Sequence, residues 1–228
     1  PQTETVWRQA TEFNVPRLVF ANKMDKLGAD YEYSLETIKK RLGVNAKPIA
    51  WPIGAESNFK GIIDILNRKA LIYDGSADEK YTETDVPEDM KDFIEEKRTD
   101  LIEAVAEFDD ELMEKYLEGE EVSVDLVKRA IRKGTLAVKF FPVTVGSAKA
   151  NMGIKFALDA VIDYLPSPLD IGAAECVDKN GNDVLRKADD NEPFTALAFK
   201  VMTDSFVGTI TFFRVYSGKL SSGSYGLS

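Results

Sequence analysis

Leu18-Val19-Phe20-Ala21-Asn22-Lys23-Met24-Asp25 is a short apolar run that ends abruptly in polar residues. Aliphatic, β-branched and aromatic residues in such a run are typical of a buried parallel strand in an α/β domain. Ligands of α/β folds bind just beyond the carboxyl ends of the strands. The run therefore predicts an α/β fold with a ligand site at Asn22, Lys23 and Asp25.

The chemistry of these three side chains suits guanine. A carboxylate accepts two parallel N–H bonds, which guanine offers along its Watson–Crick edge and adenine does not, so Asp25 would select the base. The Asn22 amide can donate to a ring nitrogen and tie neighbouring loops together. The aliphatic part of Lys23 can lie along the base while its ammonium stays in water. The alternative is a strand end with an ordinary solvated loop, because chance produces this pattern in roughly a few per cent of chains of this size.

The composition of the 228 residues excludes several classes of protein. The chain is 44% hydrophobic and 30% charged, and it has no apolar run long enough to span a membrane. It contains no histidine, which excludes Ser-His-Asp and Cys-His catalysis and histidine-ligated metal sites within the chain. A single cysteine, Cys176, excludes an internal disulfide and fits a reducing cytosol, so we expect a cytoplasmic protein. The net charge of −10 argues against a surface devoted to nucleic acid.

The charge is concentrated in residues 78–121. This segment contains 19 Asp and Glu but 5 Lys and Arg, a net charge of −14, so the rest of the chain carries +4. The apolar spacing after Pro87 predicts three helices, the first of which has acidic residues opposite its apolar face. Such a face is by default a solvated surface, but a patch of one sign can also steer a basic partner.

The pattern of the other residues predicts helices beside the strand 17–21 and a small antiparallel sheet after them. A helix over 3–13 places Val6, Ala10 and Phe13 on one face. A second helix is capped by Asp30 and ended by Gly43. Short strands between residues 47 and 85 predict the antiparallel sheet.

A second buried strand, 137–145, ends at Gly146-Ser147-Ala148-Lys149 and is followed by a helix over 153–165. Small residues let backbone N–H groups approach a ligand, so this loop can bind a base carbonyl oxygen, which again favours guanine. The apolar residues expected to face inward from the helix are Ile154, Leu158, Val161 and Leu165.

Gly54-Ala55-Glu56 is an alternative second loop, and it lies much closer to Asn22 in the sequence. It leads into further strands, however, whereas Ala148 leads into a strongly apolar helix. We therefore favour Gly146–Lys149, with the intervening residues forming a folded insertion.

The machinery for phosphate chemistry is missing from the sequence. No G-x-x-x-x-G-K-[ST] loop occurs, so nothing cradles phosphates or holds Mg²⁺ through a hydroxyl. Asp25-Lys26-Leu27-Gly28 spells the Asp-x-x-Gly of a γ-phosphate switch, but it overlaps the base-binding motif and cannot serve both ends of one nucleotide. The sequence thus offers the base half of a nucleotide site, with no catalytic residue and no metal ligands.

Taken together, these residues resemble the bacterial translational GTPases. The resemblance runs through nearly the whole chain, and further matching segments are Pro1–Ala10, Tyr164–Pro168, Phe199–Asp204, Val207–Gly208 and Arg214–Gly218. It implies an α/β fold: a partial P-loop-type GTPase domain with an inserted α+β subdomain, followed by the start of an all-β barrel domain. The implied GTPase parts are 1–46 and 122–166, the acidic insertion is 47–121, and the incomplete barrel domain is 167–228.

The resemblance also implies a function. The parent protein would use GTP with Mg²⁺ to move tRNA and mRNA on the ribosome, and this chain would contact GTP or GDP through the base alone. Its insertion would approach the stalk protein of the large ribosomal subunit, and no membrane partner is expected. The family's phosphate loop, switch regions and catalytic histidine would precede Pro1, so we expect an internal part of a longer protein. The end, 223–228, departs from the apolar strand expected there.

Two other functions remain open from the sequence. The chain could come from another ribosome-associated GTPase, such as a tetracycline-resistance ribosome-protection protein or a release factor. It could also act only as a non-catalytic protein-binding module through its acidic helices.

Overall fold

The computed structural model describes residues 2–178 and 180–224, and the chain divides into two compact units, Pro1–Leu165 and Pro166–Ser228. Within these described residues, no helix has the length and apolar character needed to cross a membrane. The last four residues of the predicted departure at 223–228 lie outside the described residues.

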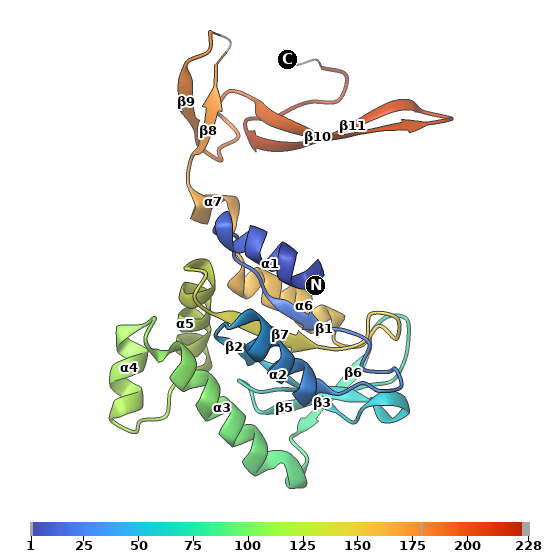
Figure 1. Cartoon of the computed structure of the whole chain (residues 1–228), viewed down its shortest axis with the longest axis vertical. Helices are drawn as coiled ribbons and strands as arrows, with labels where there is room; N and C mark the ends of the chain where they lie inside the picture. The colour runs from blue at the N-terminus through green and yellow to red at the C-terminus, as the bar shows by residue number, and fades with distance from the viewer. Residues whose placement is uncertain (1, 179, 225–228) are drawn as a thin grey trace. The chain divides into compact units, whose positions relative to one another are not determined.

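The first unit contains a parallel sheet of three strands, β1 (Val19–Ala21), β2 (Ala46–Pro48) and β7 (Phe141–Val145). Their order is β1-β7-β2, with Val19 opposite Val143 and Ala46 opposite Phe141 (Figure 1). All five residues of β7 are buried, as expected for a central parallel strand that is covered on both faces. Because β1 and β7 are parallel neighbours, the residues that follow them emerge at the same edge of the sheet.

Helices α1 (Gln2–Glu12), α2 (Tyr31–Leu42) and α6 (Ile154–Tyr164) belong to the same unit. The predicted ends of α2 are confirmed. The Asp30 carboxylate accepts a hydrogen bond from the Tyr33 N–H, and Gly43 ends the helix in the left-handed conformation at φ 64°.

The predicted inward face of α6 is wrong at two of its four positions, whereas Ile154 and Leu165 are half-buried. Leu158 and Val161 are 57% and 40% exposed, whereas Ala160 and Tyr164 are buried. Both sets have helical spacing, so periodicity alone could not choose between them. The packing of α6 against α5 and β7 buries Ala160 and Tyr164. The predicted apolar face of α1 differs in the same way, because Val6 is 55% exposed and no residue of that helix is buried.

A second sheet of four antiparallel strands follows β2 directly. Its strands, in the order β3-β4-β5-β6, are β3 (Ala50–Ile53), β4 (Gly61–Asp64), β5 (Lys69–Tyr73) and β6 (Tyr81–Asp85), with the short 3₁₀ helix η1 (Glu56–Asn58) after β3. Every residue of β6 is exposed, as its polar sequence predicts for an outer strand. The antiparallel patch predicted between residues 47 and 85 is confirmed from Ala50 onward, whereas Ala46–Pro48 pair in parallel with β7.

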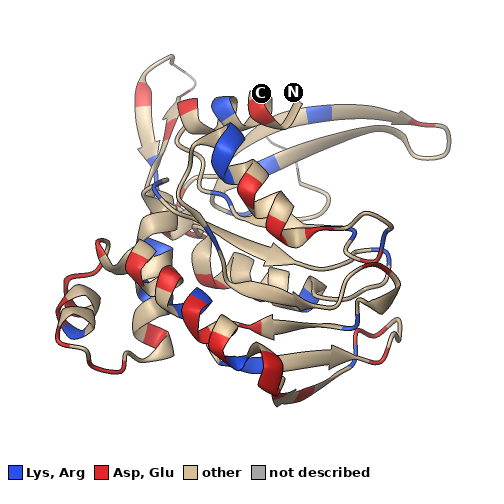
Figure 2. Cartoon of the chain, turned by 60° about the horizontal axis from the view of Figure 1, so that its bottom comes forward, with Lys and Arg blue, Asp and Glu red and all other residues tan. Residues whose placement is uncertain are grey.

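The acidic segment folds into helices around an apolar core. These are η2 (Glu88–Met90), α3 (Lys91–Ala106) and α4 (Asp110–Leu117), and α5 (Val124–Leu136) follows them. Leu101, Val105, Val127 and Ile131 are fully buried between α3 and α5. Figure 2 shows acidic positions gathered along α3 and around α4. The strand predicted over 137–145 begins only at Phe141, because the chain first turns after α5.

The second unit is built from a short helix and two hairpins. These are α7 (Pro168–Ile171), β8 (Ala174–Val177) with β9 (Asp183–Arg186), and β10 (Thr195–Asp204) with β11 (Gly208–Ser217). Both sheets have two antiparallel strands and are open within the part of the chain that the structure describes. Ser167 and Asp170 form a capping box at the start of α7.

Candidate functional site

The parallel pairing of β1 and β7 brings together the two loops that the sequence analysis selected. Ala21 and Val145 are register partners at the ends of their strands. The Gly146 N–H donates to the Ala21 carbonyl at 3.0 Å, and the Met24 N–H donates to the Gly146 carbonyl at 3.2 Å. Residues 22–25 and 146–149 therefore lie side by side, although more than 120 residues separate them in the chain.

Asn22 joins the two loops through its side-chain carbonyl. Its Oδ1 accepts the Lys23 N–H at 2.7 Å and the Ala148 N–H at 3.0 Å. This geometry leaves the amide NH₂ group as the donor for a ligand. Lys23 lies in the left-handed region at φ 69°, a conformation that a non-glycine residue adopts where its surroundings hold it.

Asp25 is held as an ionised, oriented carboxylate. Its Oδ1 accepts a hydrogen bond from the Ser147 hydroxyl at 2.6 Å, and its Oδ2 pairs with the Lys26 ammonium at 2.7 Å. The Lys26 ammonium and the Ser147 hydroxyl lower the pKa of the Asp25 carboxyl below its ordinary value. The Lys26 side chain is half-exposed, so it can exchange this contact for water when a ligand binds.

Backbone hydrogen bonds and close packing fix the conformation of the loop Gly146–Lys149. Ser147 is fully buried, and its backbone exchanges two hydrogen bonds with Met152, at 2.9 and 3.0 Å. A Cβ atom on Gly146 would lie 2.3 Å from the Met152 carbonyl oxygen, so this position requires glycine. Ala148 and Lys149 are exposed at the loop surface.

Of two glutamates outside the predicted site, one contacts the first loop and the other contacts the helix that follows the second loop. Glu56 lies in the rejected loop 54–56, and its N–H donates to the Met24 carbonyl at 2.7 Å. Its carboxylate accepts the Gly28 N–H at 2.7 Å. Glu79 accepts the backbone N–H groups of Ile154 and Lys155 at the start of α6. No sequence pattern marks either glutamate, because each bond joins elements far apart in the chain.

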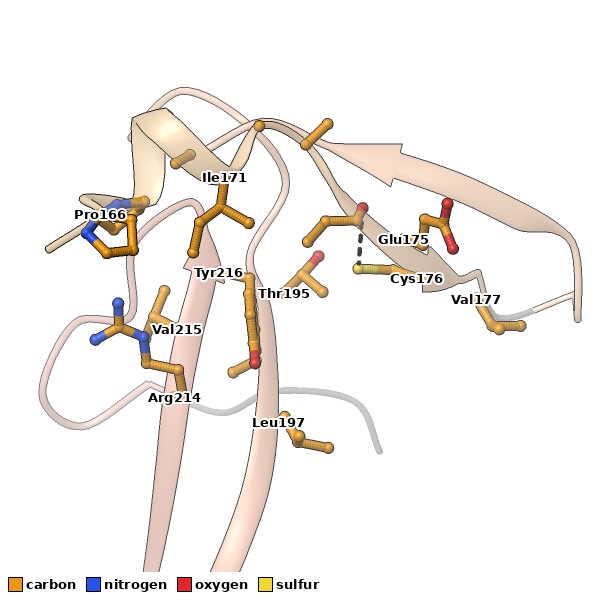
Figure 3. A pocket seen from close by; sticks show the side chains of 16 residues that line it. Pro166, Ile171, Glu175, Cys176, Val177, Thr195, Leu197, Arg214, Val215 and Tyr216 are labelled. Atoms are coloured by element: carbon orange, nitrogen blue, oxygen red, sulfur yellow. Dashed lines mark hydrogen bonds between the residues drawn. The ribbon is translucent and has the colours of Figure 1, made fainter. Parts of the chain in front are cut away.

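The surface hollows do not coincide fully with this site. A groove of about 500 Å³ touches Asn22 and Lys23 and runs along α2, but its lining includes neither Asp25 nor the loop 146–149. A larger groove of about 700 Å³ lies in the second unit, where Ile171, Leu197 and Tyr216 form apolar walls (Figure 3). Since none of the selected residues lines it, the second groove does not belong to the candidate site.

Comparison with known proteins places the chain in a family. The family model described as "Elongation factor Tu GTP binding domain" matches residues 1–167. Elongation factor G of Mycoplasma pneumoniae is 55% identical over 99% of this chain and 33% of its own length. Elongation factor G of Ureaplasma parvum serovar 3 is 56% identical over the same shares. The chain therefore spans about a third of the relatives that it matches.

The fold is also that of a solved structure. A crystal structure of a Thermus thermophilus protein has a TM-score of 0.77 and 30% sequence identity over 97% of this chain and 30% of that one. The resemblance predicted from the sequence is thus confirmed by the family model, by the relatives and by the fold. The chain belongs to the translational GTPase family defined by the elongation factor Tu GTP-binding domain.

Proposed function

We propose that Asn22, Lys23, Asp25 and the loop Gly146–Lys149 form the guanine-binding part of the GTP site in a ribosomal translocation GTPase of the elongation factor G type. The observation that supports this most is the joining of the two loops. The bonds from Ser147 to Asp25 and from Ala148 to Asn22 connect them at the carboxyl ends of neighbouring parallel strands. Ligands of α/β folds bind at such an edge.

The bonds already made within the site decide how guanine would bind. Asp25 would accept the N1–H and the exocyclic amino group of guanine, with the Lys26 ammonium moving into water. The Ala148 N–H already donates to Asn22, so a guanine carbonyl oxygen would have to share this donor with the Asn22 oxygen. The Lys23 stem would cover one face of the base.

The residues present do not fit the Mg²⁺ that accompanies GTP in such a protein. Across residues 2–178 and 180–224, no group of three or more Asp, Glu or Cys is arranged to hold a metal. The sequence also lacks a phosphate loop. The contribution of this chain is therefore base recognition.

The domain arrangement belongs to the same proposal. Residues 1–46 and 122–166 form the GTPase part, 47–121 the inserted α+β subdomain, and 167–228 the start of a β-barrel. The chain leaves the parallel sheet after β2, which ends at Pro48, two residues beyond the proposed boundary at 46. It then builds the antiparallel sheet and the acidic helices and returns to the parallel sheet with β7, which supports an insertion between β2 and β7.

The 228-residue chain alone is expected not to hydrolyse GTP and to bind GDP weakly at best. Positioning and charge stabilisation of the phosphates supply nearly all catalysis of phosphoryl transfer, and the chain has no loop for either. Phosphate release from GTP and calorimetry with GDP test this. Steady turnover above that of an Asp25→Ala sample prepared in parallel, or a micromolar GDP affinity, would contradict the expectation.

The acidic insertion has a proposed partner, the stalk protein of the large ribosomal subunit, and the protein would then act in the cytoplasm. Within 78–121, Glu95 is bound by Arg68, and Glu103 accepts a hydrogen bond from the Tyr116 hydroxyl. Reversing Glu96 to Lys, alone and together with Glu95 and Glu103, should weaken capture of the chain by the immobilised stalk protein. Glu32→Lys on α2 is the matched control, and equal capture of all variants would exclude this docking surface.

A further inference from the structure

Glu79 is a buried carboxylate that contacts the start of α6, the helix that follows the loop 146–149. It lies in the connection between β5 and β6, and its side chain is 3% exposed. Its Oε1 accepts the Ile154 N–H at 2.7 Å, and both oxygens accept the Lys155 N–H at 3.0 Å. A carboxylate at the first turn of a helix satisfies free N–H groups and complements the helix dipole. This carboxylate fixes the start of α6, which follows the loop 146–149 in the chain.

Further bonds tie the same connection to the end of that loop. The Asn151 side-chain amide donates to the Ala77 carbonyl at 2.6 Å, and the Lys155 ammonium donates to the Asp78 carbonyl at 2.8 Å. Residues 77–79 therefore hold both Asn151, within the segment that closes on Ser147, and the helix that follows it. The loop position is set from the antiparallel sheet as well as from β7.

Glu56 has the equivalent role at the other loop. Its backbone N–H and its carboxylate bind Met24 and Gly28, on either side of Asp25, both at 2.7 Å. Glu56 and Glu79 both have positive φ values, 56° and 52°. A non-glycine residue keeps this conformation only where surrounding contacts over-determine it.

We propose that Glu56 and Glu79 are positioning residues through which the antiparallel sheet β3–β6 sets the affinity of the site for guanine. Glu56 holds the loop that carries Asn22 and Asp25. Glu79 holds the start of α6, and through it the end of the segment that carries Ser147 and Ala148. Neither needs to touch the base. The proposal deepens the function proposed above and rests on it.

The test uses the ¹⁵N-labelled 228-residue chain and GMP. Wild type, Glu79→Gln, Glu79→Ala and Glu56→Ala are compared, with Glu83→Gln on the exposed strand β6 as the matched control. Removal of the buried carboxylate in Glu79→Ala should weaken GMP binding about tenfold, because it leaves buried N–H groups unpaired. Glu79→Gln retains an acceptor and should fall between Glu79→Ala and wild type. Amide exchange of Ser147 and Ala148 in the free variants should accelerate, while amides of α5 remain as protected as in wild type.

The outcomes separate the two proposals. Equal GMP affinity of wild type and both alanine variants, or unchanged exchange of Ser147 and Ala148 in Glu79→Ala, overturns the positioning role. A wild-type chain that fails to bind GMP overturns the guanine site instead, and the exchange rates, measured without nucleotide, still decide whether Glu79 positions the loop. Accelerated exchange in α5 as well would mark Glu79 as a residue of general stability and would also overturn the positioning role.

Discussion

An Asp25→Ala variant is expected to lose detectable GMP binding while keeping its fold. Two hydrogen bonds from guanine to a carboxylate contribute together about 3 kcal/mol or more, so their loss weakens binding about 100-fold or more. Asp25→Asn should lose binding as well, because it turns an NH₂ donor toward the donor edge of guanine. The fold should survive, since the Asp25 side chain lies at the rim of the sheet and is 20% exposed. Chemical-shift titration with GMP, and AMP as the control nucleotide, measures this.

Lys26→Ala is the matched control for Asp25. It removes the ion pair at Asp25 Oδ2 but leaves the carboxylate and its Ser147 bond, so GMP binding should persist.

The pKa of Asp25 is lowered in the folded chain, and GMP binding needs the carboxylate form. Binding should therefore be unchanged between about pH 7 and pH 5 and be lost only below the ordinary carboxyl pKa of about 3.9. GMP binding by Asp25→Ala at wild-type affinity would contradict the role of this residue.

The second large effect is expected at Asp109, in the acidic insertion. Asp109 is 2% exposed, and its Oδ2 binds Arg129 Nε at 2.7 Å and Lys133 Nζ at 2.6 Å. Its Oδ1 binds Arg129 Nη2 at 2.8 Å and caps α4 by accepting the Leu112 N–H at 3.3 Å. Asp109→Ala removes the cap and both ion pairs. Loss of the cap and of the buried carboxylate's ion pairs should lower the free energy of unfolding by about 3 kcal/mol. The loss stays near this value because the cations left behind are half-exposed and can regain water.

The same contacts give a pH dependence. The Arg129 guanidinium and the Lys133 ammonium hold the pKa of Asp109 far below its usual range, although its burial opposes them. This stabilisation is fully present above the unfolded pKa of about 3.9 and is lost as the pH falls toward the lower folded value. Urea unfolding at about pH 7 and pH 3 should show wild type and Asp109→Ala converging at the lower pH. Asp110→Ala, the exposed neighbour, should stay within about 0.5 kcal/mol of wild type at both.

Much of the site could be predicted because the residues that mark each loop are neighbours in the sequence. An apolar run that ends in Asn22-Lys23-Met24-Asp25, and a second one that ends in Gly146-Ser147-Ala148, each predict a strand and a polar loop. The carboxyl ends of neighbouring parallel strands lie at one edge of a sheet, so the two loops are expected side by side. The helix signals at Asp30 and Gly43 are equally local, and the structure confirms them.

The features that escaped prediction depend on contacts between distant segments. Two apolar stripes of α6 have the same period, and only the packing on α5 and β7 chooses the one with Ala160 and Tyr164. Glu79 lies in a charged segment where one glutamate among many is buried. Glu56 lies in the loop 54–56, the sequence alternative to Gly146–Lys149, yet it contacts Met24 and Gly28 on either side of Asp25. The sequence around each of these glutamates does not reveal whether its side chain is buried or which distant residue it contacts.

We propose that this chain recognises guanine through the base alone. The most direct measurement is a two-dimensional ¹⁵N spectrum of the 228-residue chain during parallel titrations with GMP and AMP. With GMP, we expect concentration-dependent shifts confined to the amides of residues 22–26 and 146–149, and with AMP at the same concentrations we expect none there. No shift with GMP, or equal shifts with both nucleotides, would contradict the claim.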